Sequence, residues 1–564
     1  MERFFNTAGP SDPKDHYCLA PLDRINLSEI INLIEQRRYF ILHAPRQTGK
    51  TTCLLTLMKY LNEEGKYKCL YVNVEAGQAE RENIDGAVRA ILTGLASNAR
   101  IYLGDLSIKQ MWPEIFRVSG GSGALEDVLS RWVEVSDKPV VLFIDEIDAL
   151  IGDTLISVLR QLRAGYTKRP GSFPQSVILC GLRDIRDYRI HSSREKTIIT
   201  GGSAFNIKSE SLRLGDFEKM DIERLYAQHT EETGQIFGEG VYALVWELTH
   251  GQPWLVNALG YEVTYRTKEN RDRSIPITVE MIQQAKENLI QRRETHLDQL
   301  ADKLQEERVR RVILPILAGE TTPEQIPPDD IEYVRDLGLI RTEGQLAIAN
   351  AIYREVIPRQ LTYSTQLTIS QEPAWYILPN GRLDMEKLLP AFQEFFREHS
   401  EHWVERFDYK EAGPQLLLQA FLQRIVNGGG RIEREYGLGR MRTDLLIVWP
   451  VQPALGPVLR TFGKLTAQDD RNPVHPEPVE GPTSGQTMSA AATQKVVIEL
   501  KILHKSLEKT IADGMVQTAA YMDRTGTADG HLVIFDRNPE KPWEEKIFRR
   551  EENQEGKRII IWGM

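Results

Sequence analysis

The sequence predicts an α/β chain that holds two separate α/β domains joined by helical segments. Three observations carry this prediction. Short apolar runs alternate with helical stretches over residues 20–285, a glycine–lysine–threonine loop follows the first run, and a later set of strand-like runs carries acidic residues. Alternation of this kind is typical of sheets whose faces are covered by helices.

Four apolar runs define the predicted sheet of the first domain. Each run is short and nearly continuous in apolar residues, as expected for strands buried on both faces of a parallel sheet. Helical segments separate the runs and provide the crossover connections that parallel strands need. The runs are 39–44, 69–74, 140–146 and 176–181.

The composition is that of an ordinary globular protein. Of 564 residues, 41% are hydrophobic and 27% charged, with a formal net charge of -10. The sequence holds no apolar run of about 18 residues and no signal peptide at its N-terminus, so we expect no membrane association. Four scattered cysteines fit a reducing, cytoplasmic location. The acidic balance argues against a general coat for nucleic acid but leaves room for a local basic cleft.

A phosphate-binding loop follows the first apolar run. The pattern G-x-x-x-x-G-K-S/T becomes Ala44-Pro45-Arg46-Gln47-Thr48-Gly49-Lys50-Thr51, with Thr52 next and alanine in place of the first glycine. Backbone N–H groups of such a loop, together with the N-terminus of the following helix, attract phosphate. We expect Lys50 to reach the β- and γ-phosphates of ATP and the Thr51 hydroxyl to bind Mg²⁺.

Paired carboxylates end the third apolar run. Residues 141–144 are apolar and lead into Asp145 and Glu146, which is the arrangement of a Walker B strand. Asp145 can hold the metal through water, and Glu146 can orient and polarise an attacking water. Alternatively, this acidic segment is only the solvated end of a strand.

Two further positions are candidate contacts of the nucleotide. Arg183 follows the fourth apolar run, where a polar side chain can contact the terminal phosphate from a neighbouring strand, although an ordinary turn would have the same sequence. Pro253 lies in a Gly-Gln-Pro turn at the predicted start of a helix.

Residues 1–360 resemble the STAND and AAA-like P-loop ATPases of prokaryotes, and the opening FNTAGP with the APRQTGKTT loop resembles the bacterial AAA-like ATPases in particular. The resemblance implies an ATP-dependent switch in which Arg183 and Pro253 respond to the nucleotide. We expect that the chain can form a homo-oligomer. No arginine finger stands out, so a ring-forming motor is less favoured.

Residues 330–349 predict a winged-helix-like unit. A helix, a short strand, a Glu-Gly turn and a second strand follow one another there. Such units can contact DNA, but the predicted recognition helix carries several acidic residues. We therefore favour a lid or packing role.

A second acidic constellation lies in the C-terminal region. Glu499 and Lys501 are two residues apart on a predicted strand, so their side chains share one face. Residues 451–493 are rich in proline and glycine and predict a disordered insertion between two strands. If the insertion is removed and the hairpin closed, Asp444 pairs with Glu499. Two carboxylates at that separation suit Mg²⁺, and a lysine can stabilise charge on phosphate.

The order Asp444, Glu499, Lys501 resembles the core of the PD-(D/E)XK nuclease superfamily, and Gln517 with Tyr521 resembles the QxxxY motif of its RecB-like branch. The resemblance implies a restriction-endonuclease-like domain that cleaves nucleic acid with Mg²⁺ or Mn²⁺; we favour DNA over RNA as the substrate, but the sequence does not decide between them. It also implies a further acidic ligand, for which Glu411 and Glu435 compete. The fold also occurs as inactive binding modules, so an ATP-dependent switch that binds nucleic acid without cleaving it remains the alternative.

These observations predict five segments. They are a P-loop ATPase core at 1–210, a helical lid at 211–290, a winged-helix-like module at 291–362, a linker at 363–392 and a nuclease-like domain at 393–564. The function that we expect is an ATP-regulated nuclease. By family analogy alone, this architecture suits mobile-element or phage-defence biology.

Overall fold

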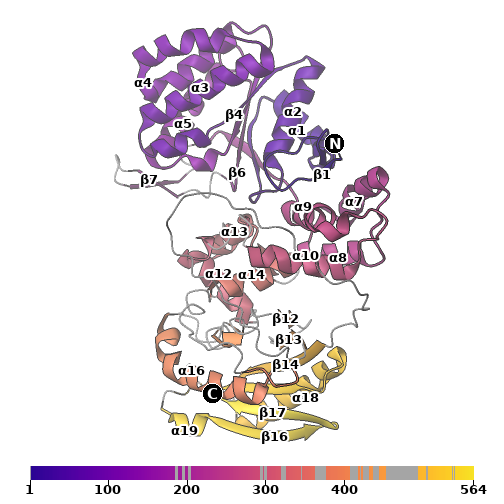
Figure 1. The fold of residues 1–564 in the computed structure, drawn as a ribbon. Coiled ribbons are helices and arrows are strands. Elements are labelled where there is room, and N and C mark those ends of the chain that lie inside the picture. Colours follow the sequence, from indigo (N-terminus) through magenta and orange to yellow (C-terminus); the bar gives the residue numbers. More distant parts are fainter. Residues whose placement is uncertain are drawn as a thin grey trace, which may run out of the picture. The chain divides into compact units, whose positions relative to one another are not determined.

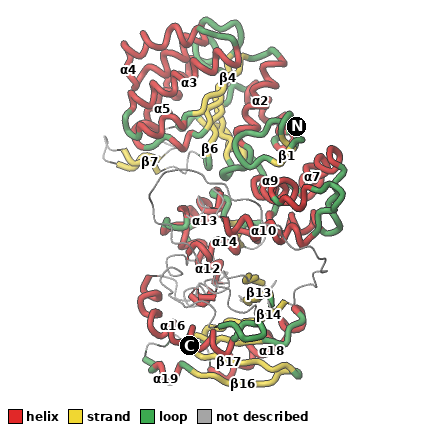
Figure 2. The backbone as a smooth tube through the Cα atoms, in the orientation of Figure 1, coloured by secondary structure: helices red, strands yellow, loops and turns green. Residues whose placement is uncertain are grey.

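The computed structural model divides the chain into two compact units (Figures 1 and 2). The first comprises Met1–Ile313 and Thr322–Val356, and the second comprises Leu314–Thr321 and Ile357–Met564. The finer division into five segments remains a prediction. The structure describes residues 2–184, 189–192, 197–200, 205–292, 296–297, 302–318, 326–343, 346–361, 376–406, 417–419, 421–422, 431–435, 444–451, 493–503, 506–536, 538 and 540–564.

A five-stranded parallel sheet forms the core of the first unit. In spatial order its strands are β4 (Lys68–Asn73), β5 (Val140–Asp145), β6 (Ser176–Gly181), β3 (Tyr39–His43) and β9 (Lys208–Arg213). The four predicted strands are confirmed. The fifth, β9, was missed because it is polar, as suits a half-exposed strand at the sheet edge.

Helices cover both faces of this sheet (Figure 1). On one face, α1 (Leu27–Glu35) and α2 (Lys50–Glu64) bury Ile34, Leu54 and Leu57 against Phe40 and Phe143. The opposite face is covered by α3 (Ile84–Leu103), α4 (Ser107–Glu134) and α5 (Gly152–Gly165). Side chains of successive strand residues therefore enter two separate cores, which explains the continuous apolar runs. A small antiparallel hairpin, β7 (Arg189–Ser192) with β8 (Thr197–Thr200), follows β6.

The segment predicted as a lid follows the sheet and is helical, and we keep the name lid for it below. It consists of α7 (Lys219–Thr233), α8 (Val241–Thr249), α9 (Pro253–Tyr261) and α10 (Val279–Arg292), with a π-helical turn at Glu262–Arg266. The N-terminal segment is part of this lid, because β1 (Phe4–Phe5) pairs with β2 (His16–Tyr17) and the buried Phe5 ring lies 5.0 Å from the Tyr226 ring of α7.

The predicted helix and hairpin of the winged-helix-like module are confirmed. Helix α12 (Glu307–Ala318) precedes α13 (Pro328–Asp336), which is followed by the antiparallel strands β10 (Ile340–Arg341) and β11 (Ala347–Ile348) and by α14 (Ala351–Leu361). Two buried contacts join this module to the lid. The Lys286 ammonium lies 2.7 Å from the Glu355 carboxylate, and His296 stacks on Trp254 while its Nε2 lies 2.5 Å from the Tyr353 hydroxyl. Burial lowers the pKa of His296 to about 3, so the ring is neutral.

The second unit is a six-stranded mixed sheet. Its spatial order is β12 (Arg431–Glu435), β13 (Asp444–Pro450), β14 (Thr493–Ile502), β15 (Gly530–Phe535), β17 (Lys557–Gly563) and β16 (Phe548–Gln554). Helix α18 (Leu507–Thr525) packs Met515 and Met522 on one face, and α16 (Met385–Arg406) packs Phe392 and Phe396 against Phe535 on the other. A short α19 (Trp543–Lys546) precedes β16.

Several expectations for the second unit need comment. The strands β12 to β15 match the predicted runs, whereas β16 and β17 were missed, β16 because it is polar in all but its first residue. Helix α16 begins at Met385, inside the predicted linker. Glu411 and residues 452–492 of the predicted insertion lie outside the described residues, and Pro450 and Thr493, which flank that gap, are register partners. Among the helices that the structure describes, none is long and apolar enough to cross a membrane.

The turn between α8 and α9 requires glycine at position 251. Gly251 has a φ of +77°, and a Cβ there would lie 1.9 Å from the Phe217 carbonyl oxygen. Gly234 has the same φ but nothing within 4 Å. We predict that both Gly251→Ala and Gly234→Ala lose about 1 kcal/mol to the left-handed backbone. The clash should cost Gly251→Ala about 1–3 kcal/mol more. Urea unfolding followed by tryptophan fluorescence measures the difference, and equal losses would contradict this account.

Candidate functional site

The loop between β3 and α2 is shaped to bind phosphate. Gln47 and Gly49 both have positive φ values, 57° and 90°, and the chain turns there directly into the first residue of α2, Lys50. A turn of this kind aims successive backbone N–H groups at one point, next to the positive end of the helix dipole. The Thr48 hydroxyl donates to the Pro45 carbonyl at 2.9 Å, which holds the loop closed.

The alanine in place of the first glycine leaves the loop intact. Ala44 is fully buried and is not among the described residues with positive φ, so this position does not need glycine. The Lys50 ammonium donates to the carbonyl oxygens of Ala44 and Pro45, both at 3.0 Å. Lys50 is 5% exposed, so a buried cation already lies over the loop.

The predicted metal residues of the first unit meet each other. The Thr51 hydroxyl donates to Asp145 Oδ2 at 2.7 Å, and the Tyr71 hydroxyl donates to the same oxygen at 3.0 Å. The other carboxylate oxygen, Oδ1, accepts from the backbone N–H of Glu146 at 3.0 Å. A hydroxyl and a fixed carboxylate at the end of a phosphate-binding loop are the oxygen ligands that Mg²⁺ prefers, so the residues present fit this ion.

Glu146 stands in a backbone conformation that a non-glycine residue rarely adopts, with a φ of 55°. This turn carries Glu146 past the end of β5, next to Asp145. Burial raises the pKa of the Glu146 carboxyl, and the nearby Lys50 ammonium opposes the shift. A carboxylate with a raised pKa accepts a proton more readily, as a general base must.

The predicted phosphate contact at Arg183 has another partner in this structure. Strand β6 lies between β3 and β5, so Leu182 and Arg183 leave the sheet between the phosphate loop and Asp145. The Leu182 N–H donates to Asp148 Oδ1 at 3.0 Å, and the Arg183 guanidinium lies over the Tyr333 ring of α13 at 4.9 Å. Arg183 and Arg46 line the same cavity, of about 440 Å³.

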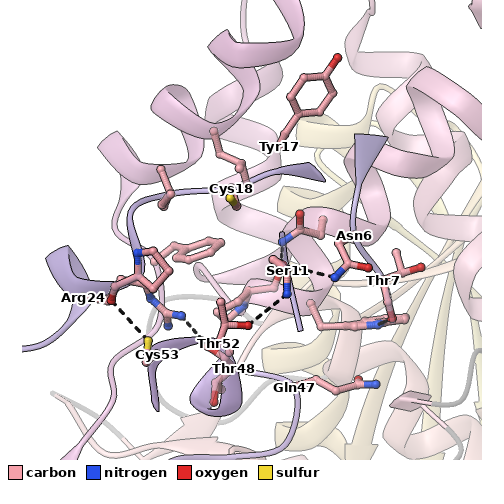
Figure 3. Close-up of a pocket in the computed structure, with 18 of the residues that line it drawn as sticks. Asn6, Thr7, Ser11, Tyr17, Cys18, Arg24, Gln47, Thr48, Thr52 and Cys53 are labelled. Carbon is pink, nitrogen blue, oxygen red and sulfur yellow. Dashed lines mark hydrogen bonds between the residues drawn. The ribbon is translucent and has the colours of Figure 1, made fainter. Parts of the chain in front are cut away.

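A pocket opens beside the phosphate loop, and we call it the side pocket (Figure 3). Its walls are the N-terminal segment, the loop, the start of α2 and the start of α9, and its volume is about 120 Å³. Pro253 therefore lines the same pocket as the loop, and its predicted contact with the nucleotide remains a prediction. The lining residues used below are Thr7, Arg24, Gln47, Thr48, Gly49, Thr52, Pro253, Trp254 and Asn257.

The N-terminal segment was not predicted as part of the site. The Ser11 N–H donates to the Thr52 hydroxyl at 3.1 Å, and the Trp254 indole N–H donates to the Thr7 carbonyl at 2.9 Å (Figure 3 shows Ser11 beside Thr52). The segment thus bridges α2 and α9 across the pocket. Its opening FNTAGP supported the family resemblance, but no spacing rule indicated these long-range contacts.

Arg24 was also missed. Its guanidinium donates to the Thr48 carbonyl at 2.5 Å and to the Gly215 carbonyl at 2.6 Å, and it lies 4.8 Å from the centre of the Phe217 ring. One side chain therefore fixes the phosphate loop to the segment that leads into the lid. A lone arginine before the first helix has no sequence signal for this role.

In the second unit, Asp444 and Glu499 lie opposite each other on neighbouring strands. They are Cα partners in the antiparallel pair β13–β14, so the predicted register is confirmed. Glu499 is fully buried, and its Oε1 lies 2.5 Å from the Lys501 ammonium. An ion pair in that position fixes the carboxylate geometry.

Gln517 and Tyr521 lie one turn apart on α18. Tyr521 belongs to the apolar cluster that α18 forms with Val497 of β14, two residues before Glu499, so this helix covers the same sheet face. Gln517 Oε1 is buried, and no donor in the described part of the chain reaches it. The Asp444 side chain and Glu411 lie outside that part, within which no three His, Cys, Asp or Glu side chains form a metal-binding group.

Comparison with known proteins concerns mainly the first unit. No curated protein matches the chain. A Walker-type ATPase of Pyrococcus abyssi is similar in structure, with 16% identity and a TM-score of 0.42, over 63% of this chain and 99% of that one. The ORC2 protein of Aeropyrum pernix has 14% identity and a TM-score of 0.37, over 61% and 94%. The RuvB Holliday junction branch migration motor of Thermotoga maritima has 14% identity and a TM-score of 0.31, over 59% and 92%.

A protein family described as AAA-like domain matches residues 24–357. The match includes the phosphate loop, Asp145 and Glu146, the lid and the helix–hairpin module, and it spans more than half of the sequence. The chain therefore belongs to the AAA-like domain family.

Proposed function

We propose that the first unit binds ATP with Mg²⁺ and hydrolyses it, and that it acts as a nucleotide-dependent switch of the STAND type. The observation that carries this proposal is the 2.7 Å hydrogen bond between the Thr51 hydroxyl and the Asp145 carboxylate, which joins the phosphate loop to the acidic strand end. Mg²⁺ bound by these two residues would neutralise charge on the phosphate oxygens.

The phosphates would lie on the loop, and the base would occupy the side pocket. Backbone N–H groups of residues 46–51 and the N-terminus of α2 provide the anion site. Lys50 would leave the carbonyls of Ala44 and Pro45 and bind the phosphates instead, because a full negative charge is the stronger acceptor. The side pocket, closed by the N-terminal segment and by Pro253, suits the flat base.

Glu146 would act as the general base that accepts a proton from the attacking water. Its raised pKa matches this role, and its position past the end of β5 sets it beside the metal residues. Because protonation abolishes a base, turnover should fall on acidification at a pH above the usual range for a glutamate.

For the second unit we propose a nuclease of the PD-(D/E)XK type that is regulated by the nucleotide state of the first. The Asp444–Glu499 register and the Lys501 ion pair favour it. The two carboxylates would hold Mg²⁺ or Mn²⁺, and Lys501 would stabilise charge on the scissile phosphate of DNA. Gln517 and Tyr521 would position this cluster from α18. The second candidate is a domain that binds nucleic acid without cleaving it.

The first prediction separates binding from turnover. Lys50→Ala should weaken binding of Mg²⁺·ATP at least about tenfold, because a charge-assisted contact to phosphate is lost. Glu146→Gln should bind ATP normally but turn it over at least about a hundredfold more slowly. Calorimetry and phosphate release measure the two quantities. Unchanged turnover in Lys50→Ala would contradict the proposed site.

A second prediction concerns Arg24, which positions the loop. Arg24→Met should weaken ATP binding about threefold to tenfold, because the Thr48 carbonyl loses its donor. Arg224 is more than half exposed and pairs with Asp23 at 3.4 Å, so Arg224→Met serves as the matched control with unchanged affinity. Equal affinities for the two variants would show that Arg24 does not order the loop.

A third prediction tests the carboxylate cluster. Asp444→Asn, Glu499→Gln and Lys501→Met should each abolish cleavage of single- or double-stranded DNA or RNA in Mg²⁺ or Mn²⁺, with and without ATP. Lys495→Met, on the same strand, removes a lysine that donates to the Thr525 carbonyl and should leave cleavage unchanged. Wild-type protein that binds nucleic acid but never cleaves it would favour the binding-only candidate.

A further inference from the structure

A cavity of about 270 Å³ adjoins the start of the phosphate loop, and we call it the front pocket. The side pocket contacts the loop at residues 47–49, whereas the front pocket contacts it at Pro45 and Arg46. The remaining walls come from Leu182 after β6, Asp216 after β9, the turn between α8 and α9, and the winged-helix-like module, which also contributes Asp302 and Lys303. The lining residues that matter here are Pro45, Leu182, His250, Gln252, Gly338 and Asn350.

The side-chain amide of Gln252 lines this cavity and has a hydrogen-bond donor without an acceptor. The side chain is 6% exposed, and its Oε1 accepts from the Leu255 N–H at 2.6 Å, which caps α9. That bond assigns the oxygen, so the amide nitrogen Nε2 is the other end of the group. Nε2 is buried, and no acceptor in the described part of the chain reaches it. A buried donor without an acceptor is costly, which suggests that a ligand supplies the acceptor.

The imidazole of His250, two residues before Gln252 in the sequence, provides a second donor at the same cavity. Its Nε2 lies 2.6 Å from Arg341 Nη1, and a guanidinium can only donate, so Nε2 accepts and the ring is neutral. The ring hydrogen must then be on Nδ1. Nδ1 is also buried, and it makes no hydrogen bond of standard geometry within the described residues, although the backbone of Glu247, one turn earlier, interacts with the ring.

We infer that Gln252 and His250 bind the terminal phosphate of a nucleoside triphosphate, and that Arg341 couples this contact to the winged-helix-like module. The inference rests on the proposed ATP site. Two donors beside the start of the loop match an acceptor-rich anion, and Lys50 lies at the same end, 3.0 Å from the Pro45 carbonyl. A diphosphate lacks the group that would reach them.

The coupling has a second contact. Gly338, which follows α13, packs so closely on Pro45 that a Cβ there would lie 2.8 Å from the Pro45 ring. The module therefore contacts the loop through Gly338 and the lid turn through Arg341. A phosphate that draws His250 Nδ1 toward itself also moves the Nε2 that accepts from Arg341.

The test compares ADP with a non-hydrolysable ATP analogue on the full-length chain by calorimetry in Mg²⁺. Gln252→Glu keeps the oxygen that caps α9 and replaces only the donor. We expect at least about a tenfold loss of affinity for the triphosphate and less than about a threefold loss for ADP, since a hydrogen bond to a charged group is removed. His250→Phe keeps the ring and removes both nitrogens, and should give a smaller loss with the same selectivity.

Asn257→Asp is the matched control, because it adds the same charge on the same helix but at the side pocket. It should weaken both nucleotides equally. Equal losses for ADP and the analogue in Gln252→Glu and in His250→Phe, or no loss in either, would overturn the inference while leaving the ATP site standing. Wild-type protein that binds neither nucleotide would instead remove the proposed function, and this inference with it.

Discussion

The hydrogen bond between Thr51 and Asp145 depends on the whole architecture of the first unit. It joins the first turn of α2 to the end of β5, two strands away from β3, with β6 between them. Because the strands are parallel, the carboxyl ends of β3 and β5 lie at the same edge, and with only β6 between them the two side chains come within hydrogen-bond distance. Two separate apolar cores hold the sheet, so the positions of Thr51 and Asp145 are fixed by packing as well as by the hydrogen bonds that the Asp145 carboxylate accepts.

Much of this fold could be predicted because strands buried on both faces of a parallel sheet consist of nearly continuous apolar residues. The same rule fails at sheet edges, where β9 and β16 are polar since part of each strand faces water. The phosphate loop and the acidic pair have fixed local spacing and were found. Arg24, Ser11 and Gln252 act through contacts with residues far along the chain, and no local spacing encodes such contacts.

In the second unit, counting residues outward from a proline-rich stretch was enough to predict the pairing of Asp444 with Glu499. This succeeds because antiparallel register is set once any one pair is known. Lys501 follows from the two-residue period of the strand. The packing of α18 on that face did not follow from the sequence, because it depends on the close fit of Gly514 against Leu532.

The partnership of Pro450 with Thr493 has a practical consequence for anyone who engineers this chain. Whatever length of polypeptide connects them leaves the hairpin and returns to it at adjacent points. The free energy of closing such a connection grows only slowly with its length. The residue pairs of β13 and β14 from this junction to Asp444 and Glu499 keep their alignment whatever segment is inserted between Pro450 and Thr493. This junction is therefore a permissive position for a fluorescent or affinity module.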